Sequence, residues 1–166
     1  MNLNSTEAIF RALNKAAVRY LVAGGLAVNA HGYMRFTKDV DFVIQLVPDN
    51  IHRTFQALAQ LGYRPNVPIS ESQFQDEALR KRWILEKGMQ VLQLWSDLHI
   101  ETPIDIFVEE PFPFDVEYDR ALVKAMYGSI EVRFVSIPTL IRMKESANRE
   151  QDRIDIEHLR TRLDKE

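Results

Sequence analysis

Two aspartates inside an apolar stretch are the feature that most constrains this chain. The stretch reads Lys38-Asp39-Val40-Asp41-Phe42-Val43-Ile44, and its β-branched and aromatic residues predict a buried strand over 39–46. Acidic residues are depleted from strands, and buried carboxylates are normally paired or bound to metal. Because residues i and i+2 of a strand share a face, Asp39 and Asp41 aim two carboxylates at one place, roughly 6–7 Å apart along the strand. Mg²⁺ is a natural occupant of such a site.

Two further motifs accompany the acidic strand. Gly24-Gly25 follows a short apolar strand at 20–23 and opens a helix predicted over 26–31. Such a turn exposes backbone N–H groups, and a helix N-terminus favours anions such as phosphate. A later strand predicted at 104–108 carries Asp105 in its centre. Three carboxylates are able to hold one or two Mg²⁺ ions beside a phosphate chain, an arrangement suited to phosphoryl or nucleotidyl transfer.

The remaining hydrophobic periodicity predicts an α/β (α+β) fold with a small mixed sheet flanked by helices. Further helices are expected at 4–17, 49–61, 70–88, 121–127, 136–146 and 151–163, further strands at 89–95 and 130–135, and a loop or irregular edge at 64–69. No linker is long or low in complexity. We therefore expect a single domain over 1–166, with a sheet-containing core at 1–135 and a short helical C-terminal region at 136–166.

Composition excludes several classes of function. The chain has no cysteine, which rules out disulfides, thiolate catalysis and cysteine zinc sites and fits a cytoplasmic protein. Its N-terminus does not resemble a signal peptide, and no apolar run is long enough to cross a membrane. With a net charge of −3, a broad grip on duplex DNA is not expected, although the basic segments 80–82 and 142–153 remain able to hold a short RNA end.

The order of these motifs resembles the polymerase β-like nucleotidyltransferase superfamily. Its pattern is an apolar strand, Gly-Gly or Gly-Ser, a helix, Asp-x-Asp on the next strand and a third acid on a later strand. Within the superfamily the chain is similar to small bacterial proteins related to the AbiEii toxins of toxin–antitoxin pairs. The resemblance extends from about residue 20 to 159 and is carried by residues 21–27, 35–41, 103–106, 140–144 and 149–155.

The resemblance implies metal-dependent transfer of a nucleoside monophosphate from an NTP to an acceptor hydroxyl, with Mg²⁺ as cofactor. Asp39 and Asp41 would ligate Mg²⁺, and Asp105 would complete a second metal site and accept the acceptor's proton. The residues implied to bind nucleotide are Gly24, Gly25, Arg35, Thr37, Lys144 and Asp152. Many members carry serine after the first glycine. Here that place is held by Gly25, which offers no hydroxyl to a phosphate but keeps its backbone N–H.

Other interpretations of single residues stay open at this stage. Arg35 and Thr37 fit a role in ordering the loop before the acidic strand. Lys144 fits a solvated helix face, and Asp105 fits a simple salt bridge. Asp152 and its neighbour Asp155 fit helix-surface charges or partners of Arg149 and Arg153.

Alternatives also remain for the whole chain. One is a catalytically idle nucleotide-binding module of the same fold. Another is a partner-binding protein of a toxin–antitoxin pair, whose cognate antitoxin or partner completes or blocks the site. The acceptor itself is open between an RNA such as a tRNA end, a protein and a small molecule.

Overall fold

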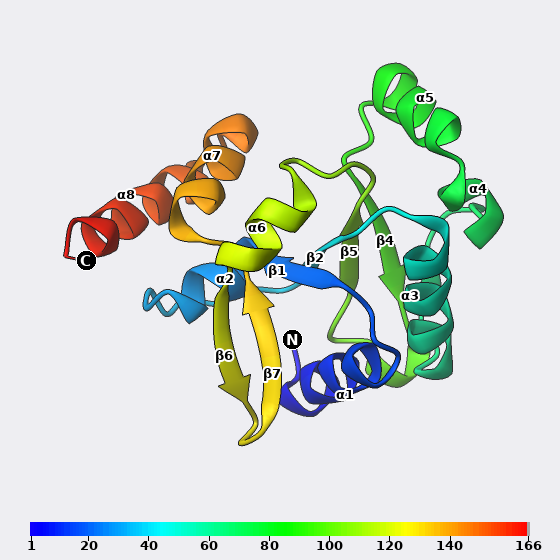
Figure 1. Ribbon diagram of the computed structural model, residues 1–166, viewed down its shortest axis with the longest axis horizontal. Coiled ribbons are helices and arrows are strands. Elements are labelled where there is room, and N and C mark those ends of the chain that lie inside the picture. Colours follow the sequence, from blue (N-terminus) through cyan, green and yellow to red (C-terminus); the bar gives the residue numbers. More distant parts are fainter. Residues whose placement is uncertain (166) are drawn as a thin grey trace.

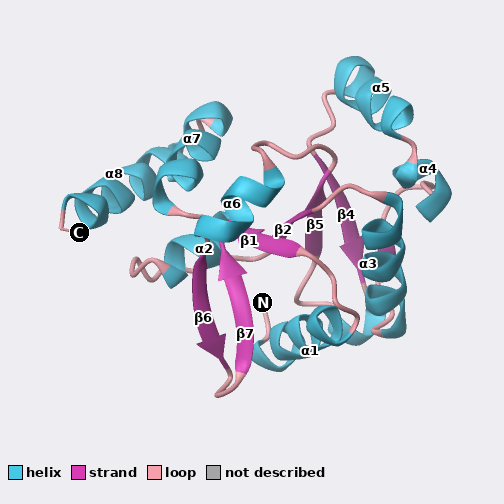
Figure 2. Ribbon diagram, in the orientation of Figure 1, coloured by secondary structure: helices cyan, strands magenta, loops and turns pink. Residues whose placement is uncertain are grey.

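The computed structural model describes residues 1–165, which build one seven-stranded mixed sheet with helices around it (Figures 1 and 2). The strand order is β3-β4-β5-β2-β1-β7-β6. The strands are β1 (Tyr20–Ala23), β2 (Val40–Ile44), β3 (Arg64–Pro65), β4 (Val91–Trp95), β5 (Ile104–Phe107), β6 (Leu122–Met126) and β7 (Ile130–Phe134). The predicted mixed sheet is thereby confirmed.

The centre of the sheet combines two parallel pairs with one antiparallel pair. Strand β2 runs antiparallel to β1 and parallel to β5, and β1 runs parallel to β7. All four residues of β1 are buried, as expected for a strand covered on both faces. The register sets Asp41 beside Ala23 on one side and beside Asp105 on the other. The acidic strand therefore lies at the middle of the sheet, between the glycine turn and the third acid.

Eight α-helices and one short 3-10 turn surround the sheet in the described chain. They are α1 (Leu3–Lys15), α2 (Gly24–Ala30), α3 (Pro48–Gln60), α4 (Glu71–Gln75), α5 (Glu77–Lys87), the turn at Asp97–His99, α6 (Phe114–Arg120), α7 (Ile137–Ala147) and α8 (Glu150–Asp164). The helices α7 and α8 pack together at one end of the molecule, and α4 and α5 lie at the other (Figure 1). None of these helices combines the length and the apolar character needed to cross a bilayer.

The first helix is fixed by a cap and by aromatic packing. The side chain of Asn2 accepts hydrogen bonds from the backbone N–H groups of Asn4 and Ser5 in the first turn of α1. One turn later, Phe10 meets Phe42 of β2 edge-on at 6.0 Å between ring centroids, and Tyr20 of β1 meets the same ring at 5.3 Å. Edge-to-face contacts of this kind add about 0.5–1.5 kcal/mol each beyond the buried area. This cluster holds α1 against the two central strands.

Residues 121–127, expected as a short helix, form strand β6 instead. The segment pairs along its whole length with β7, from Leu122 beside Phe134 to Met126 beside Ile130. Tyr127 and Gly128, both at positive φ, close the hairpin. Cross-strand pairing outweighs the helical propensity of this segment, because propensity is a weak preference that tertiary contacts override.

Two other expectations needed smaller corrections. The single charged helix expected over 70–88 is two helices, because the extended backbone of Asp76 interrupts it and the Asp76 side chain caps α5.

The helix α6 was not predicted, and it carries the buried acid Glu117. That carboxylate accepts hydrogen bonds from Ser136 and Thr139 at the start of α7 and from Arg120. Burial alone would raise the pKa of Glu117, but these donors lower it, and the contact fixes the position of α7.

Candidate active site

Asp41 and Asp105 lie side by side on neighbouring parallel strands. They are direct register partners of β2 and β5, so their side chains leave the same face of the sheet. Adjacent strands are about 4.8 Å apart, which brings the two carboxylates within reach of each other. On the far side of Asp105, Gln93 of β4 donates its side-chain amide to Asp105 Oδ1 at 3.1 Å. Gln93 was not predicted as a site residue, because an amide in a strand carries no distinctive sequence signal.

Asp39 stands just before β2 on the same face of the chain. Its Oδ1 atom is buried and has no hydrogen-bond partner among the described residues. A buried carboxylate oxygen without a donor is costly, because it loses its hydration and gains nothing in exchange. An orphaned oxygen beside two other carboxylates marks a place that suits a cation.

The raised pKa values of Asp41 and Asp105 also indicate a place that suits a cation. Burial, with the neighbouring charges of Asp105 and Asp39, raises the pKa of Asp41 to about 7, even though Lys144 and Arg149 lower it. Burial and the charge of Asp39 also raise the pKa of Asp105. These shifts mean that the protein holds negative charge here without enough positive charge of its own. A proton or a metal ion relieves that repulsion.

The donor set fits Mg²⁺ that is shared with a substrate. Within residues 1–165, no group of three or more His, Cys, Asp or Glu side chains is placed so that it could hold a metal ion, so the expected three-carboxylate metal site is not formed by the protein alone. Mg²⁺ rarely uses such an all-protein cage, and it binds through one or two carboxylates together with water and substrate phosphates. The orphaned oxygen of Asp39 and the raised pKa of Asp41 therefore fit a partial site that a phosphate chain completes.

The two glycines are in close contact with the acidic strand and with the loop before it. Gly24 follows β1 and begins α2 with φ +62°, and a Cβ on it would overlap Asp41 Oδ2 and lie 2.7 Å from Asp41 Cγ. A Cβ on Gly25 would overlap Thr37 Oγ1 and lie 2.6 Å from Thr37 Cβ. The turn is thus packed against the acidic strand on one side and against the preceding loop on the other, with no room for side chains.

The loop before β2 presents its residues to the site in alternation. Arg35, Thr37 and Asp39 are half-buried, whereas the residues between them are exposed. This is the pattern of an extended segment with one face against the protein. Arg35 directs its guanidinium at Asp155 of α8, with Nε and Nη2 at 2.8 and 2.7 Å from the two carboxylate oxygens. The loop is therefore tied to the C-terminal helix.

A second charged cluster lies between α7 and α8. Lys144 Nζ donates to Asp155 Oδ2 at 2.8 Å and to Asp152 Oδ1 at 3.3 Å, and all three side chains are almost fully buried. Arg149 donates to Asp152 through its backbone N–H and its Nε, at 3.0 and 2.9 Å, while 77% of its side chain stays exposed. Lys144 and Arg149 both lower the pKa of Asp41, so this cluster borders the three acids.

The interpretation of Asp152 and Asp155 as helix-surface charges is wrong. The two acids share the buried face of α8 with Ile156 and Leu159. Positions 152, 155, 156 and 159 follow helical spacing, and this signal was available in the sequence. The interpretation of Lys144 as a solvated helix residue is also wrong, because its ammonium is enclosed by the two acids. The other interpretation, that these acids pair with Arg149 and Arg153, holds for Asp152, which binds Arg149. Asp155 binds Arg35 and Lys144 instead.

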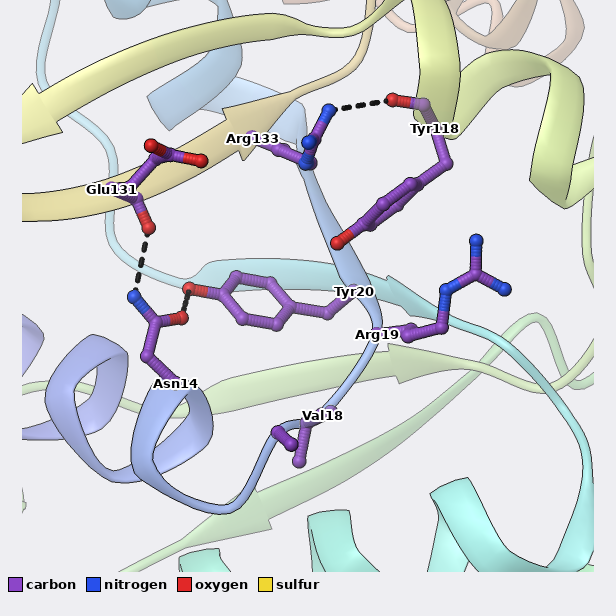
Figure 3. A pocket seen from close by; sticks show the side chains of 8 residues that line it. Asn14, Val18, Arg19, Tyr20, Tyr118, Glu131 and Arg133 are labelled. Atoms are coloured by element: carbon purple, nitrogen blue, oxygen red, sulfur yellow. Dashed lines mark hydrogen bonds between the residues drawn. The ribbon is translucent and has the colours of Figure 1, made fainter.

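A separate cavity of about 290 Å³ lies at the opposite end of β1 (Figure 3). Tyr118 stacks there between the guanidinium groups of Arg19 and Arg133, 4.5 and 4.2 Å from its ring centroid. Tyr20 donates its hydroxyl to Asn14 in the same cavity. None of the three acids or the two glycines lines it, so it is not part of the candidate active site.

Comparison with known proteins identifies the fold. No protein-family model and no curated protein sequence matches the chain. Among solved structures, the lincosamide antibiotic adenylyltransferase LnuA, crystallised with lincomycin, superposes with a TM-score of 0.60 at 15% identity over 96% of this chain and 97% of that one.

Two other structures agree with this comparison. ANT(2″)-Ia, in complex with adenylyl-2″-tobramycin, gives a TM-score of 0.56 at 13% identity over 96% of this chain and 88% of that one. A proposed nucleotidyltransferase from Thermotoga maritima gives 0.54 at 13% identity over 99% and 93%. At such identities the likeness bears on architecture alone. From its sheet and from these three superpositions, the chain has the nucleotidyltransferase fold.

Proposed function

We propose that this protein is a Mg²⁺-dependent nucleotidyltransferase that moves a nucleoside monophosphate from an NTP to a hydroxyl of a small-molecule acceptor. The observation that carries the proposal is the placement of Asp41 beside Asp105 in register, with the orphaned oxygen of Asp39 next to them. A structural role explains this arrangement poorly, because unpaired buried carboxylates destabilise a fold. A site that binds a cation and a phosphate chain accounts for it.

Asp39 and Asp41 are the proposed Mg²⁺ ligands. When bound, Mg²⁺ neutralises charge on the triphosphate and on the leaving pyrophosphate. Gly24 lies directly against Asp41 and Gly25 against Thr37, and the backbone N–H groups of this turn are the proposed contacts of the phosphates. The chain's own contribution is to hold the nucleotide in line for attack.

Asp105 is the proposed acceptor of the hydroxyl proton. In the transfer, the acceptor oxygen forms a bond to the α-phosphorus, the bond from that phosphorus to the pyrophosphate oxygen breaks, and the hydroxyl proton passes to Asp105. Burial and the charge of Asp39 raise the pKa of Asp105, which makes it a better base than a free carboxylate. Gln93 fixes Asp105 Oδ1 and so orients the carboxyl group.

Lys144 and Asp152 are proposed to act on the nucleotide side of the site. The ammonium of Lys144 is already paired with two acids, so we do not expect it to bind a phosphate directly. Its positive charge acts on the phosphates at longer range, as it does on Asp41. Arg149 is bound to Asp152 and largely exposed, which makes its guanidinium the available cation at the rim. We propose that Arg149 contacts the triphosphate there.

A small-molecule acceptor is favoured by the solved relatives. LnuA and ANT(2″)-Ia are described with lincomycin and with adenylyl-tobramycin, and this chain covers 97% of the LnuA chain. The 24 acidic residues against 21 basic ones give little capacity for a long nucleic acid. The resemblance to AbiEii-type toxins instead points to an RNA end, with a cognate antitoxin as partner, and that reading is tested alongside.

The decisive experiment uses each of the four NTPs labelled at the α-phosphate. The protein and Mg²⁺ are incubated with hydroxyl-bearing lincosamides and aminoglycosides, with tRNA and with cell extract, and the labelled product is identified. Asp41→Asn is the inactive variant, and Asp119→Asn, an exposed acid of α6, is the matched control. We expect Mg²⁺-dependent label on a small molecule in wild type and in the control variant only.

Each other outcome has a defined meaning. Label on a tRNA end supports the toxin-like alternative over the small-molecule acceptor. Mg²⁺-dependent NTP binding without transfer to any acceptor indicates the idle nucleotide-binding module. Transfer that persists undiminished in Asp41→Asn contradicts the assignment of the metal site.

A further inference from the structure

Two charges of opposite sign line the cavity at the Tyr20 end of β1 without pairing. Glu131 and Arg133 stand at alternate positions of β7, so both side chains leave the same face of that strand (Figure 3). Their Cα atoms are roughly 6–7 Å apart along the strand. Within residues 1–165, neither side chain forms an ion pair, with the other or with a third residue. The cavity is therefore bordered by one unneutralised cation and one unneutralised acid.

The neighbouring strand β6 supplies no counter-charge. In the antiparallel ladder, Ala125 lies beside Glu131 and Val123 lies beside Arg133. An opposite charge directly across a ladder would stabilise a charged side chain, and here both of those positions are held by uncharged residues. The two charges are thus left to solvent and to whatever occupies the cavity.

The donors that remain free lie around Arg133. Its Nη1 atom donates to the backbone carbonyl of Tyr118 at 2.9 Å, and its other N–H groups bond to no described residue. The Tyr118 hydroxyl makes no hydrogen bond within the described chain either, and it points towards Tyr20 (Figure 3). Arg19, on the other hand, is ion-paired with Asp115 at 2.8 Å. One guanidinium and one hydroxyl are therefore available to a ligand.

The other hydrogen-bonding groups of the cavity are already engaged. Tyr20 donates its hydroxyl to Asn14 Oδ1, and Asn14 donates its amide to the backbone carbonyl of Glu131, each at 2.8 Å. These bonds join α1, β1 and β7 and fix the backbone that carries the Glu131 carboxylate. The Glu131 side chain itself stays exposed, so its carboxylate is the available acceptor.

We propose that this cavity binds a free α-amino acid in its zwitterionic form. The ligand carboxylate binds the guanidinium of Arg133 and the hydroxyl of Tyr118, and the ligand ammonium binds the carboxylate of Glu131. A guanidinium matches a carboxylate through two parallel hydrogen bonds. The cavity volume of about 290 Å³ is at the small end of the range for ligand pockets, which suits a metabolite of this size better than a nucleotide.

A zwitterion fits these walls better than a simple ion. An anion on Arg133 would be repelled by Glu131, and a cation on Glu131 would be repelled by Arg133. A ligand that carries both charges on adjacent atoms neutralises both walls at once. The inference does not depend on the proposed function, because none of the three strand acids or the two glycines lines this cavity.

The first test varies the ligand. Each standard α-amino acid is titrated into the protein at pH 7 by isothermal titration calorimetry, with no nucleotide or metal present. For the amino acid that binds most tightly, the analogue without the amino group and the analogue without the carboxyl group should each bind at least about 10-fold more weakly, because each loses a charged hydrogen bond. If no amino acid binds, or if the analogue without the amino group binds equally well, the inference is overturned.

The second test varies the protein and uses the same amino acid. Glu131→Gln is nearly isosteric and lies on an exposed side chain, so its melting temperature should match that of wild type. We expect Glu131→Gln and Arg133→Gln each to bind about 10- to 100-fold more weakly. Tyr118→Phe should also weaken binding, by a smaller factor.

The matched controls are Glu157→Gln on α8 and Arg82→Gln on α5, both exposed and away from the cavity. Both should bind the amino acid as wild type does. If Arg133→Gln melts at a much lower temperature than wild type, Glu131→Gln decides the test by itself. Wild-type affinity in Glu131→Gln would overturn the inference.

Discussion

Two charged clusters lie next to each other in this protein and behave in opposite ways. The strand-borne cluster of Asp39, Asp41 and Asp105 holds like charges together, and burial raises the pKa of Asp41 to about 7. The helix-borne cluster pairs Asp152 and Asp155 with Lys144, Arg149 and Arg35. Burial alone would raise the pKa of Asp155 as well, but its donors lower that pKa to about 2.

We propose that the strand-borne charges serve binding, whereas the helix-borne charges serve structure. Every oxygen of the helix-borne pair has a donor within the protein, so removing one partner breaks a satisfied network. The strand-borne cluster keeps an orphaned oxygen and unrelieved repulsion. Strain of that kind persists in a fold when a ligand relieves it, and the contrast therefore supports the proposal that the acids on the strands form the chemical centre.

The largest expected effect is on the chemistry of the strand-borne cluster. Asp41→Asn keeps the shape and removes the charge that holds Mg²⁺, a change worth several kcal/mol of transition-state stabilisation. We expect nucleotidyl transfer to fall by more than about 1000-fold. The melting temperature without metal should rise, because repulsion is relieved. A melting temperature that drops sharply would show that Asp41 holds the fold together and would erase the contrast between the clusters.

The helix-borne cluster should respond through stability instead. Lys144→Met removes the ammonium shared by Asp152 and Asp155 and leaves two buried acids short of a partner. We expect the free energy of unfolding to decrease by about 3 kcal/mol, as measured by urea titration. Lys87→Met, at the exposed end of α5, should change it by less than about 0.5 kcal/mol. Equal stability of the two variants would contradict the structural role.

The pH dependence of stability should have opposite signs for the two clusters. The folded pKa of Asp41, about 7, lies above its ordinary 3.8, so its stabilising contribution is complete below about pH 4 and is lost as the pH rises to 7. The folded pKa of Asp155, about 2, gives stability that is present above about pH 4 and lost as the pH falls towards 2.

Unfolding titrations of the metal-free protein between about pH 4 and 7 test this. Wild type should lose roughly 2–4 kcal/mol relative to Asp41→Asn across that range. Parallel curves for the two proteins would mean that Asp41 titrates normally, and the electrostatic argument for a cation site would fall.

The smallest effect is expected where the two clusters meet. Arg149 is largely exposed, so Arg149→Gln should reduce the free energy of unfolding by less than about 1 kcal/mol. It should nevertheless raise the pKa of Asp41, because Arg149 lowers it in wild type. Carboxyl NMR titration of Asp41 measures this pKa. The control is Arg153→Gln, because the side chain of Arg153 is exposed near Arg149 on α8. The same Asp41 pKa in both variants would separate Arg149 from the site.

The three strand acids were selected from the sequence, whereas the burial of the helix-borne acids was missed although their helical spacing carried a signal for it. Asp39, Asp41 and Asp105 stand out because acids contradict the apolar strands around them. On α8 the acids are interspersed with many other charged residues. Because aspartate is exposed in most proteins, Asp152 and Asp155 were placed on the surface. The misassigned segment 121–127 shows the same limit, since only its pairing with β7 makes it a strand.

The sequence by itself determined the mixed sheet, the glycine turn and the three strand acids, because local periodicity and residue type settle strands and turns at short range. Tertiary structure alone decided that Asp41 and Asp105 share a register, that Lys144 is buried between two acids, and that Thr37 fills the space at Gly25. Each of these facts joins segments distant along the chain. Such contacts depend on how whole elements pack, and no local pattern encodes which partner a side chain will meet.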